Sequence, residues 1–398
     1  MKKIEGTIAS PLGYYADGIH CGLKRKKLDL GWIYSEVPAS VAGVFTTNQV
    51  QAAPVIESRK IIQNGQLQGI LVNSGNANAC TGEQGIQNTK TMQKLASEKW
   101  GIDPNLVAVA STGIIGHQLP MDKIEAGIEQ LHQSTTKEAE HFQQAILTTD
   151  TGQKSVVIET VIDGQTVTIA GCGKGSGMIH PNMATMLGFV TTDAAISSAL
   201  LQKALSELTE VTFNQITVDG DTSTNDMVLV MANGLANNTE ITEQNADYAA
   251  FKEGLVFVLT ELAKLIAKDG EGATKLIQVD VKGAKTALDA RMMAKSVVGS
   301  MLVKTAIFGK DPNWGRILCS LGYSDAPLNP ETVTIQLAGL TVFDKGQPVS
   351  FDQEVMVQQL EHDTIVIDVL LQDGEAFGQA WGCDLTYDYV KINALYHT

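Results

Sequence analysis

Near its midpoint the chain reads Gly171-Cys172-Gly173-Lys174-Gly175-Ser176-Gly177-Met178-Ile179-His180-Pro181-Asn182-Met183-Ala184-Thr185-Met186-Leu187. Glycines carry no side chain, so a run of them lets the backbone approach a neighbouring group closely. A single lysine stands among the glycines, and a proline turn follows. We therefore take Thr185, which comes after that turn between small and apolar residues, as the candidate reactive centre.

A lysine among glycines also suggests a phosphate-binding loop, but the spacing fits neither common motif. In GxxxxGK[ST], Thr168 would stand at the first glycine, and Gly175 would stand where a hydroxyl residue is needed. In GxGxxG, Ser176 occupies the position of the third glycine. Nucleotide binding by this stretch is therefore disfavoured.

Patterns on both sides of the stretch predict a mixed α/β protein with extensive, largely antiparallel sheet. Two alternating runs flank Asp163-Gly164, which is a strong hairpin signal. Apolar residues at helical spacing predict a helix over 248–268, which Gly270 would end. Strands are predicted at 43–48, 52–55, 69–72, 106–110, 155–160, 166–170, 187–191, 227–231, 276–281 and 302–308, helices at 86–100, 121–131, 137–147, 195–211 and 287–298, and a turn at 311–316.

Two polar segments follow predicted strands and are candidates for ligand contacts. The first is 73–80, rich in small amide and hydroxyl residues, which either binds a ligand or simply turns the chain. The second contains Thr112-Gly113, where free backbone N–H groups at a strand end can build an oxyanion hole. An ordinary turn is the alternative for both. The acidic loop at 219–226 lacks the glycine and glutamate of a calcium loop, which favours a self-bonded turn.

Composition limits the class of protein. A chain of 398 residues predicts two lobes or two domains that share a core. The net charge of −15 disfavours nucleic acid and anionic membranes as partners. The five cysteines form no CxxC pair, and no apolar run approaches the ~18 residues that would cross a bilayer. We expect an unexported, cytoplasmic protein without a metal or cofactor.

A threonine hydroxyl is a weak nucleophile unless a base lies beside it. One solution makes the threonine an N-terminus, so that its own α-amino group acts as the base. The pKa of that amine is ~8, and a nearby cation such as Lys174 would lower it. Thr185 is internal, so this chemistry requires cleavage of the Ala184-Thr185 bond.

The sequence resembles the ornithine acetyltransferase family, also called glutamate N-acetyltransferase, essentially from end to end. Gly43-Val44-Phe45-Thr46, Ala52-Ala53-Pro54-Val55 and Asn73-Ser74-Gly75-Asn76-Ala77-Asn78-Ala79 begin the series of shared motifs. The series continues with Ser111 to Gly116, Thr148 to Thr151, Gly173 to Ile179, Pro181 to Leu187, Asp269 to Lys275, Asp311 to Arg316 and Tyr389 to Ala394.

The resemblance implies an N-terminal-nucleophile-like sandwich, in which packed β-sheets are flanked by helices, plus a smaller C-terminal lobe. It implies self-cleavage into an α fragment, 1–184, and a β fragment, 185–398, which share one α/β core. Two copies of each fragment would form a heterotetramer. The implied activity belongs to arginine biosynthesis.

The implied reaction is ping-pong. Thr185 takes the acetyl group of N-acetylornithine and passes it to glutamate, while Thr112 and Gly113 stabilise the oxyanion in both half-reactions. Thr148, Lys174, Glu271, Asn393 and Thr398 would line the substrate site, with Glu271 opposite the ornithine ammonium and Lys174 and Asn393 toward the carboxylate.

Three alternatives stay open at this point. Within the family, a bifunctional variant also takes acetyl-CoA as the acetyl donor. An N-terminal-nucleophile amidase or aminopeptidase would pass the acyl group to water instead. A binding protein for acetylated amino acids would remain uncut.

Overall fold

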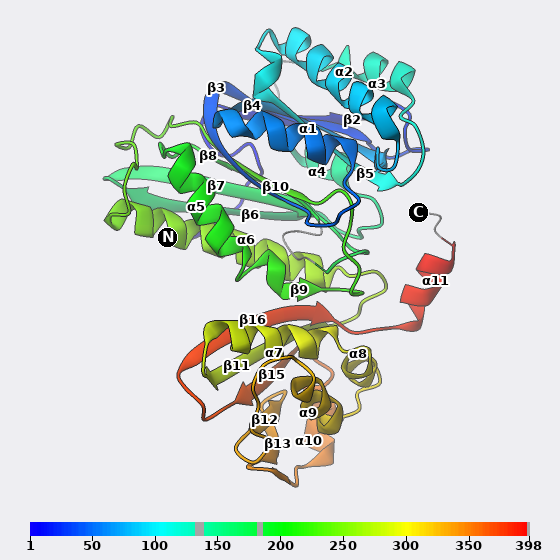
Figure 1. The fold of residues 1–398 in the computed structure, drawn as a ribbon, viewed down its shortest axis with the longest axis vertical. Helices are drawn as coiled ribbons and strands as arrows, with labels where there is room; N and C mark the ends of the chain where they lie inside the picture. Colours follow the sequence, from blue (N-terminus) through cyan, green and yellow to red (C-terminus); the bar gives the residue numbers. More distant parts are fainter. Residues whose placement is uncertain (132–138, 181–185, 396–398) are drawn as a thin grey trace.

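The computed structural model describes residues 1–131, 139–180 and 186–395. Two lobes lie one above the other in Figure 1, and the upper, N-terminal lobe is the larger. The chain crosses between them through β9 (Ile216–Thr217) and after α6 (Ala246–Lys268), and it returns at its C-terminal end. Both lobes combine sheets with covering helices, which confirms the predicted α/β class and the smaller C-terminal lobe.

The large lobe is built on a nine-stranded sheet in the order β1-β6-β7-β8-β10-β3-β4-β5, with β2 paired to β3. Its strands are β1 (Lys2–Ile4), β2 (Tyr14–Ile19), β3 (Leu30–Phe45), β4 (Gln66–Asn76), β5 (Val107–Ile114), β6 (Lys154–Ile162), β7 (Gln165–Lys174), β8 (Leu187–Thr192) and β10 (Met227–Ala232). Most ladders are antiparallel, as predicted, but β4 with β5 and β8 with β10 are parallel.

Strand β3 belongs to both halves of this sheet. Its first part, Leu30 to Ser35, pairs with β2 and β4, and its last part, Ser40 to Phe45, pairs with β10. The register with β4 shifts between Tyr34 and Ala39, and such an irregularity bends a strand. The two halves of the sheet therefore face each other, and side chains from both fill the space between them.

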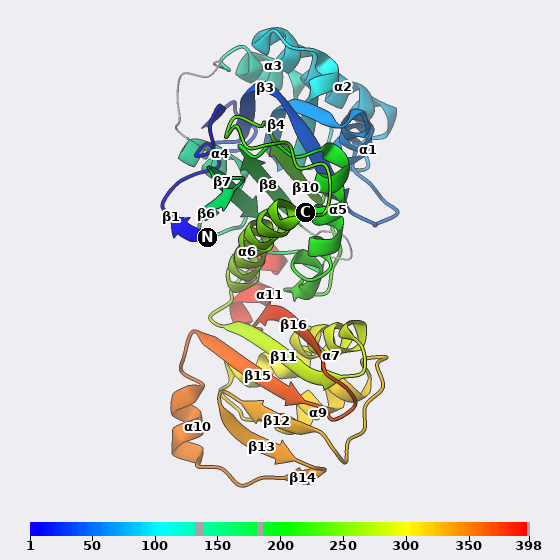
Figure 2. The same ribbon diagram turned by 90° about the vertical axis from the view of Figure 1, so that its left-hand side faces the viewer.

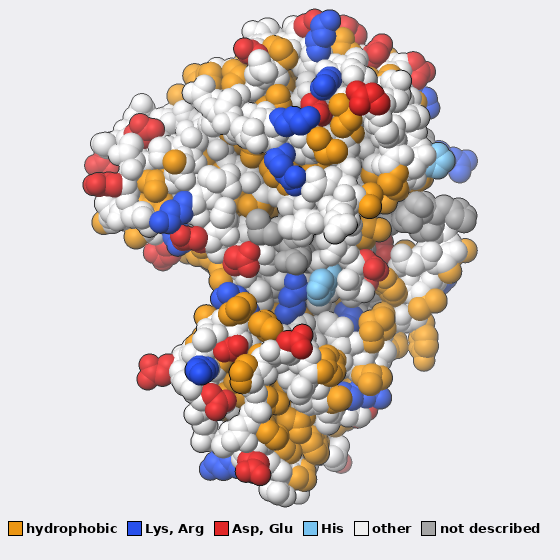
Figure 3. Space-filling model, in the orientation of Figure 1, with side chains coloured by type: hydrophobic (Ala, Val, Ile, Leu, Met, Phe, Trp, Pro, Cys, Tyr) orange, Lys and Arg blue, Asp and Glu red, His pale blue; other side chains and the backbone are white. Residues whose placement is uncertain are grey.

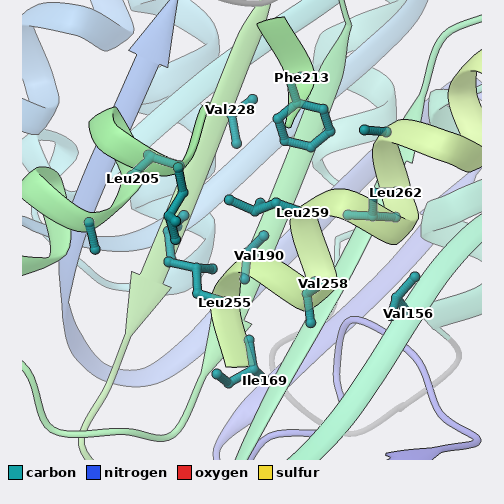
Figure 4. Close-up of a cluster of buried hydrophobic side chains, with 14 of the residues drawn as sticks. Val156, Ile169, Val190, Leu205, Phe213, Val228, Leu255, Val258, Leu259 and Leu262 are labelled. Carbon is teal, nitrogen blue, oxygen red and sulfur yellow. The ribbon is translucent and has the colours of Figure 1, made fainter. Parts of the chain in front are cut away.

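Three hydrophobic clusters define the layers of the large lobe. Phe189 and Leu229 face the inner space, where Phe142 of α4 (Ala139–Ile146) meets Phe189 edge-on with ring centroids 5.5 Å apart. On one outer face α5 (Ser198–Thr209) and α6 cover Ile169, Val190 and Val228 (Figure 4). On the other, α2 (Gly82–Trp100) and α3 (Met121–Ile128) cover β4 and β5.

The resulting order is helix, sheet, sheet, helix, which is the layered sandwich expected from the resemblance. Successive side chains of a strand point to opposite faces, so a single strand can contribute to two layers. In β10, Val228 and Val230 face α6, whereas Leu229 and Met231 face the inner space. A strand buried on both faces needs apolar residues at every position, and all six residues of β10 are buried.

The small lobe has a seven-stranded sheet in the order β14-β13-β12-β15-β11-β16-β9 (Figure 2). Its strands are β9, β11 (Leu276–Ala284), β12 (Thr334–Leu337), β13 (Leu340–Asp344), β14 (Gln347–Pro348), β15 (Thr364–Leu370) and β16 (Ala376–Cys383). Its helices are α7 (Ala287–Gly299), α8 (Met301–Phe308), α9 (Trp314–Gly322) and α10 (Gln353–Gln359), and α11 (Tyr387–Leu395) follows the last strand back toward the large lobe.

The two lobes share apolar contacts. Trp381 and Cys383 of β16 and Leu276 of β11 belong to the same hydrophobic cluster as α6. β9 joins the small sheet by pairing in parallel with β16. The position of α6 between the lobes therefore couples the C-terminal third of the chain to the large sheet.

Three local predictions were wrong. Residues 52–55 are not a strand, because α1 (Ala53–Ile61) begins there with Pro54 in its first turn, where proline is well tolerated. Residues 302–308 form α8, whose N-cap Ser300 accepts a hydrogen bond from the Val303 N–H. The turn predicted at 311–316 was wrong only in its second half: residues 311–313 are not helical, and α9 begins at Trp314 with Asn313 as its N-cap. The first residues of the helix predicted at 137–147 lie outside the described part.

Candidate active site

A cavity of about 280 Å³ lies where β5, β7, the loop after β9 and α11 meet. It brings together six residues that the sequence analysis assigned to the site, namely Thr112, Gly113, Thr148, Lys174, Glu271 and Asn393. Ala184, Thr185 and Thr398, the other assigned residues, lie outside the described residues. Met186, which directly follows Thr185, lines a small adjoining space of about 30 Å³ together with Thr112 and Lys174.

The end of β5 is built from close backbone contacts. Gly113 has φ +132°, and a Cβ there would lie 2.3 Å from the carbonyl carbon of Gly75 in β4. A side chain at this position is excluded both by the conformation and by the neighbouring strand. The glycine therefore fixes the wall of the cavity, with the Thr112 hydroxyl beside it.

Lys174 ends β7 and reaches across to that wall. Its Nζ donates to Thr112 Oγ1 over 3.1 Å. Burial lowers the pKa of Lys174, and the Lys154 cation adds to that effect, while Asp150, Asp226 and Glu271 oppose it. Since Thr112 Oγ1 accepts from the lysine, its hydroxyl hydrogen is directed elsewhere and is available to donate to another acceptor.

Asp150 anchors the end of β7 that carries Lys174. Its carboxylate accepts from Lys154 Nζ over 2.6 Å, from the Gly175 N–H over 2.7 Å and from the Thr148 N–H over 3.1 Å. Burial disfavours the charge, but Lys174, Lys154 and these hydrogen bonds outweigh it and lower the pKa of Asp150 to about 2. Lys154 also pairs with Asp269, two residues before Glu271.

We expect Asp150→Asn to lower the free energy of unfolding by about 3 kcal/mol at pH 7, because it leaves a buried lysine short of its partner. The folded pKa, about 2, lies below the ordinary value of 3.8, so the stabilisation is complete above that ordinary value and is lost as the pH falls through 2. Urea unfolding between pH 7 and pH 2 measures it. A difference between the two proteins that stays constant over this range would contradict the assignment.

The opposite wall of the cavity carries a carboxylate. Asn393 of α11 donates from Nδ2 to Glu271 Oε2 over 2.7 Å. A Cβ at Gly177 would lie only 2.4 Å from the Glu271 carboxyl carbon, so a glycine is needed there for the carboxylate to enter the cavity. Glu271 is held in place by its backbone N–H, which donates to the Ser176 carbonyl over 3.0 Å.

The loop at 219–226 belongs to the site, which the sequence analysis missed by assigning it to a self-bonded turn. Asp219 lines the cavity and accepts from the N–H groups of Met178 and Ile179 over 2.7 and 2.9 Å. Asn225 donates from Nδ2 to the carbonyls of Ala77 and Ser111 over 2.6 and 2.8 Å. The loop therefore ties the glycine-rich stretch to β4 and β5.

Two more residues line the cavities, Asp226 of the acidic loop and Tyr389 of a shared motif, and the sequence analysis assigned neither of them to the site. Asp226 lines the small space beside Met186, and burial raises the pKa of its carboxyl well above the usual range. Burial also raises the pKa of Tyr389, which faces Asp219 and Glu271.

Within the described ranges, no group of three or more His, Cys, Asp or Glu is placed to hold a metal ion. None of the helices described is long and apolar enough to span a membrane.

Comparison with known proteins places this arrangement in one family. The family model described as "ArgJ family" matches residues 15–398. The arginine biosynthesis bifunctional protein ArgJ of Streptococcus thermophilus strain CNRZ 1066 is 58% identical over 399 residues, and that of Listeria monocytogenes serotype 4b is 57% identical, each covering 100% of both chains. A solved chain of the Bacillus halodurans protein of that name is 54% identical, with a TM-score of 0.52, and covers 53% of this chain and 100% of its own. The chain described here therefore belongs to the ArgJ family.

Proposed function

We propose that this chain is a glutamate N-acetyltransferase of arginine biosynthesis, which transfers the acetyl group of N-acetylornithine to glutamate through acetyl-Thr185. The observation that carries the proposal is the Lys174–Thr112 pair, which lies beside Gly113 at one wall of the cavity and beside Met186 in the adjoining space. Because Met186 directly follows the proposed nucleophile in the sequence, we take Thr112 as the oxyanion donor and Lys174 as the nearby cation.

Maturation would cut the Ala184-Thr185 bond and create a free α-amino group at Thr185. The solved Bacillus halodurans chain matches over its whole length but covers only 53% of this chain. The proposed fragment 185–398 makes up a similar share, slightly more than half of the sequence, which supports the division. The two proposed fragments, 1–184 and 185–398, remain interleaved after the cut, because β7 and β8 are adjacent strands of one sheet.

In the first half-reaction the α-amino group takes the proton from Thr185 Oγ, and the oxygen attacks the acetyl carbonyl. Negative charge develops on the carbonyl oxygen, toward Thr112 and Gly113. The amide C–N bond then breaks, the proton passes to the leaving amine, and ornithine departs. Glu271, on the wall opposite Lys174, would pair with the side-chain ammonium of ornithine.

In the second half-reaction the neutral amine of glutamate attacks the carbonyl carbon of acetyl-Thr185, and the same donors stabilise the oxyanion. The C–O bond to Thr185 Oγ then breaks, and the proton lost by the amine passes through the α-amino group to Thr185 Oγ. In a ping-pong reaction ornithine leaves before glutamate enters, so the two substrates can use the same cavity in turn. Its volume, about 280 Å³, lies at the small end of ligand-binding pockets and suits one amino-acid derivative at a time. Lys174, Asn393 and Thr398 would hold the substrate carboxylate, and Asn393 would exchange one of its two present hydrogen bonds, to Glu271 or to the Tyr389 carbonyl, for the substrate.

The assembly proposed is a heterotetramer of two α and two β fragments. Helix α11 carries Tyr389 and Asn393 of the site, yet none of its residues is buried. Hydrophobic side chains gather over the C-terminal lobe in Figure 3, and the most exposed include Met301, Leu302, Tyr387, Val390 and Leu395. A second copy that covers this surface would bury them and fix α11.

The five cysteines are unpaired, which suits the reducing cytoplasm.

The proposal is tested by mixing the purified protein with N-acetylornithine and glutamate. We expect equimolar ornithine and N-acetylglutamate, and N-acetylornithine alone should leave one acetyl group on the fragment that begins at Thr185, detected by intact mass. Acetate in place of N-acetylglutamate would contradict the transferase assignment and favour the amidase.

A further inference from the structure

Asp226 is a buried acid at the junction between the acidic loop and β10, and it has no part in the reaction proposed above. The residue is 2% exposed and directly precedes Met227, the first residue of the strand. It lines the small space of about 30 Å³ together with Thr112, Lys174 and Met186. Asp226 therefore shares that space with the proposed oxyanion donor and its cation.

The backbone on both sides of the Asp226 side chain is fixed. The Asp226 carbonyl accepts from the Thr46 N–H over 3.0 Å, and the Met227 N–H donates to the Met186 carbonyl over 3.0 Å. β10 pairs in parallel with β8, and Met227 lies opposite Leu187. One step back in the same register, Asp226 lies beside Met186, the residue that directly follows Thr185.

The two oxygens of the Asp226 carboxyl have different surroundings. Hydrogen bonds from the Ser223 hydroxyl and the Met186 N–H favour its charged form. Oδ2, in contrast, is buried and has no hydrogen-bond partner among the described residues. A buried polar atom without a partner is costly and rare in folded proteins, so a further donor at Oδ2 would stabilise the site.

The charges around Asp226 favour a cationic donor. Burial raises the pKa of Asp226 well above its usual range, and the Lys174 cation partly opposes the effect of burial. The strands β5, β8 and β10, and β3 from residue 40 onward, carry no titratable side chain. Asp219 and Asp221 of the same loop line the larger cavity instead. A second cation beside Oδ2 would therefore stabilise the ionised carboxylate.

We propose that Asp226 is a positioning residue for the nucleophile, and that its Oδ2 accepts a hydrogen bond from the α-amino group that cleavage creates at Thr185. The proposal rests on the proposed function, since this amino group exists only after the cut. The α-amino nitrogen and the Met186 N–H belong to consecutive residues, so one carboxylate can bind both. Asp219 binds two consecutive nitrogens in this way, because its two oxygens accept from the N–H groups of Met178 and Ile179.

The carboxylate would act on the reaction through the α-amino group. An amine held by a hydrogen bond does not rotate freely, so its lone pair stays available to Thr185 Oγ. When Oγ gives up its proton, the ammonium that forms lies beside the carboxylate, which neutralises its charge. The proton then passes to the leaving amine, so Asp226 is unchanged at the end of the cycle. Lys174 lowers the pKa of the α-amino group and Asp226 raises it, so the two effects oppose each other.

The test is the pH profile of Asp226→Asn, which keeps an oxygen for the Met186 N–H but carries no charge. We expect the variant to be cleaved, because the uncut chain has no α-amino group at residue 185. We expect kcat/KM for N-acetylornithine to fall by about 10-fold to 100-fold. Without the carboxylate the ammonium loses its proton more readily, so the acid limb of the profile should move about 1 unit to lower pH.

A merely structural role would lower the amount of active enzyme and leave the acid limb in place. The matched control is therefore Asp193→Asn, which removes an equally buried carboxylate at the other end of β8. Asp193 accepts from the N–H groups of Leu12 and Thr168 over 3.0 and 2.8 Å, and burial raises its pKa too. We expect the control to keep the acid limb of the wild type. A second variant, Asp226→Ser, removes the carboxyl with a smaller side chain and should shift the limb as Asp226→Asn does.

An acid limb that stays in place in both Asp226 variants, or that moves equally in Asp193→Asn, would overturn the proposal. A folded Asp226→Asn protein that remains uncut would overturn it as well, because the residue would then act in the cleavage itself. Failure of both Asp226 variants to fold would assign the residue a structural role instead. If the wild type transfers no acetyl group from N-acetylornithine to glutamate, the proposed function itself fails, whatever the variants show.

Discussion

Thr185→Ala is expected to yield a single uncut polypeptide of 398 residues with transferase activity at least about 1,000-fold below that of the wild type. Alanine has no hydroxyl, so neither the attack on the Ala184-Thr185 bond nor the acetyl-enzyme is available. The fold should persist, because the cores around β7 and β8 consist of other residues. Intact mass reports the cleavage, and the release of ornithine from N-acetylornithine reports the activity.

Thr185→Ser is the matched control, since it keeps an oxygen nucleophile and an α-amino group after the cut. We expect it to be cleaved and to retain measurable transfer. A fully cleaved Thr185→Ala protein would show that another residue starts the cut. A cleaved but inactive Thr185→Ser protein would show that residue 185 acts as the nucleophile in the cleavage but would contradict its role as the nucleophile in acetyl transfer.

The fold could be predicted from sequence where the apolar spacing was long and regular. Leu255, Leu259, Leu262 and Ile266 mark α6, and all four are buried. The Asp163-Gly164 pair marks the β6–β7 hairpin. Short apolar segments were less informative: the run at 302–308 fits a strand or a helix equally well, and only the Ser300 cap, seen in the structure, decides for the helix.

The curvature of the large sheet had no counterpart in the sequence patterns. Strand β3 changes partners partway along its sixteen residues, and that change depends on pairing with β4 and β10, which lie far along the chain. Most of the strands predicted for the large sheet are therefore present, but their stacking into two layers was expected only from the family resemblance.

Some residues of the site could be predicted from the sequence, and others could not. Thr112, Lys174 and Glu271 lie in motifs that the resemblance covers, and they do line one cavity. Asp219 and Asn225 were missed because their contribution lies in long-range hydrogen bonds, such as that from Asn225 to Ala77. The spacing of residues in the sequence cannot predict that a side-chain amide in one loop will hydrogen-bond to two strands far away in the chain.

Lys174→Met is expected to lower kcat by about 100-fold to 1,000-fold while the chain is still cleaved. Methionine has a similar length but cannot donate to Thr112 Oγ1, so the hydroxyl loses the polarisation that suits it to an oxyanion. Because one set of donors serves both half-reactions, acetylation of Thr185 and its deacetylation by glutamate should slow by similar factors. Rapid-mixing measurements of each half-reaction check this expectation.

Lys154→Met separates the role of Lys174 from a general loss of buried charge. Lys154 forms an ion pair with Asp150, whose charge also acts on Lys174, and it is buried like Lys174, but it does not line the cavity. Its loss breaks the pairs with Asp150 and Asp269, so we expect roughly 3 kcal/mol less stability with a smaller effect on kcat. The reverse pattern, in which Lys154→Met abolishes turnover and Lys174→Met only destabilises, would move the oxyanion role away from the Lys174–Thr112 pair. A residue that donates to the oxyanion, or that polarises such a donor as Lys174 does with Thr112, should slow both half-reactions by similar factors. A lysine that merely supports the fold acts on the folded fraction and leaves the rate of the folded enzyme largely intact.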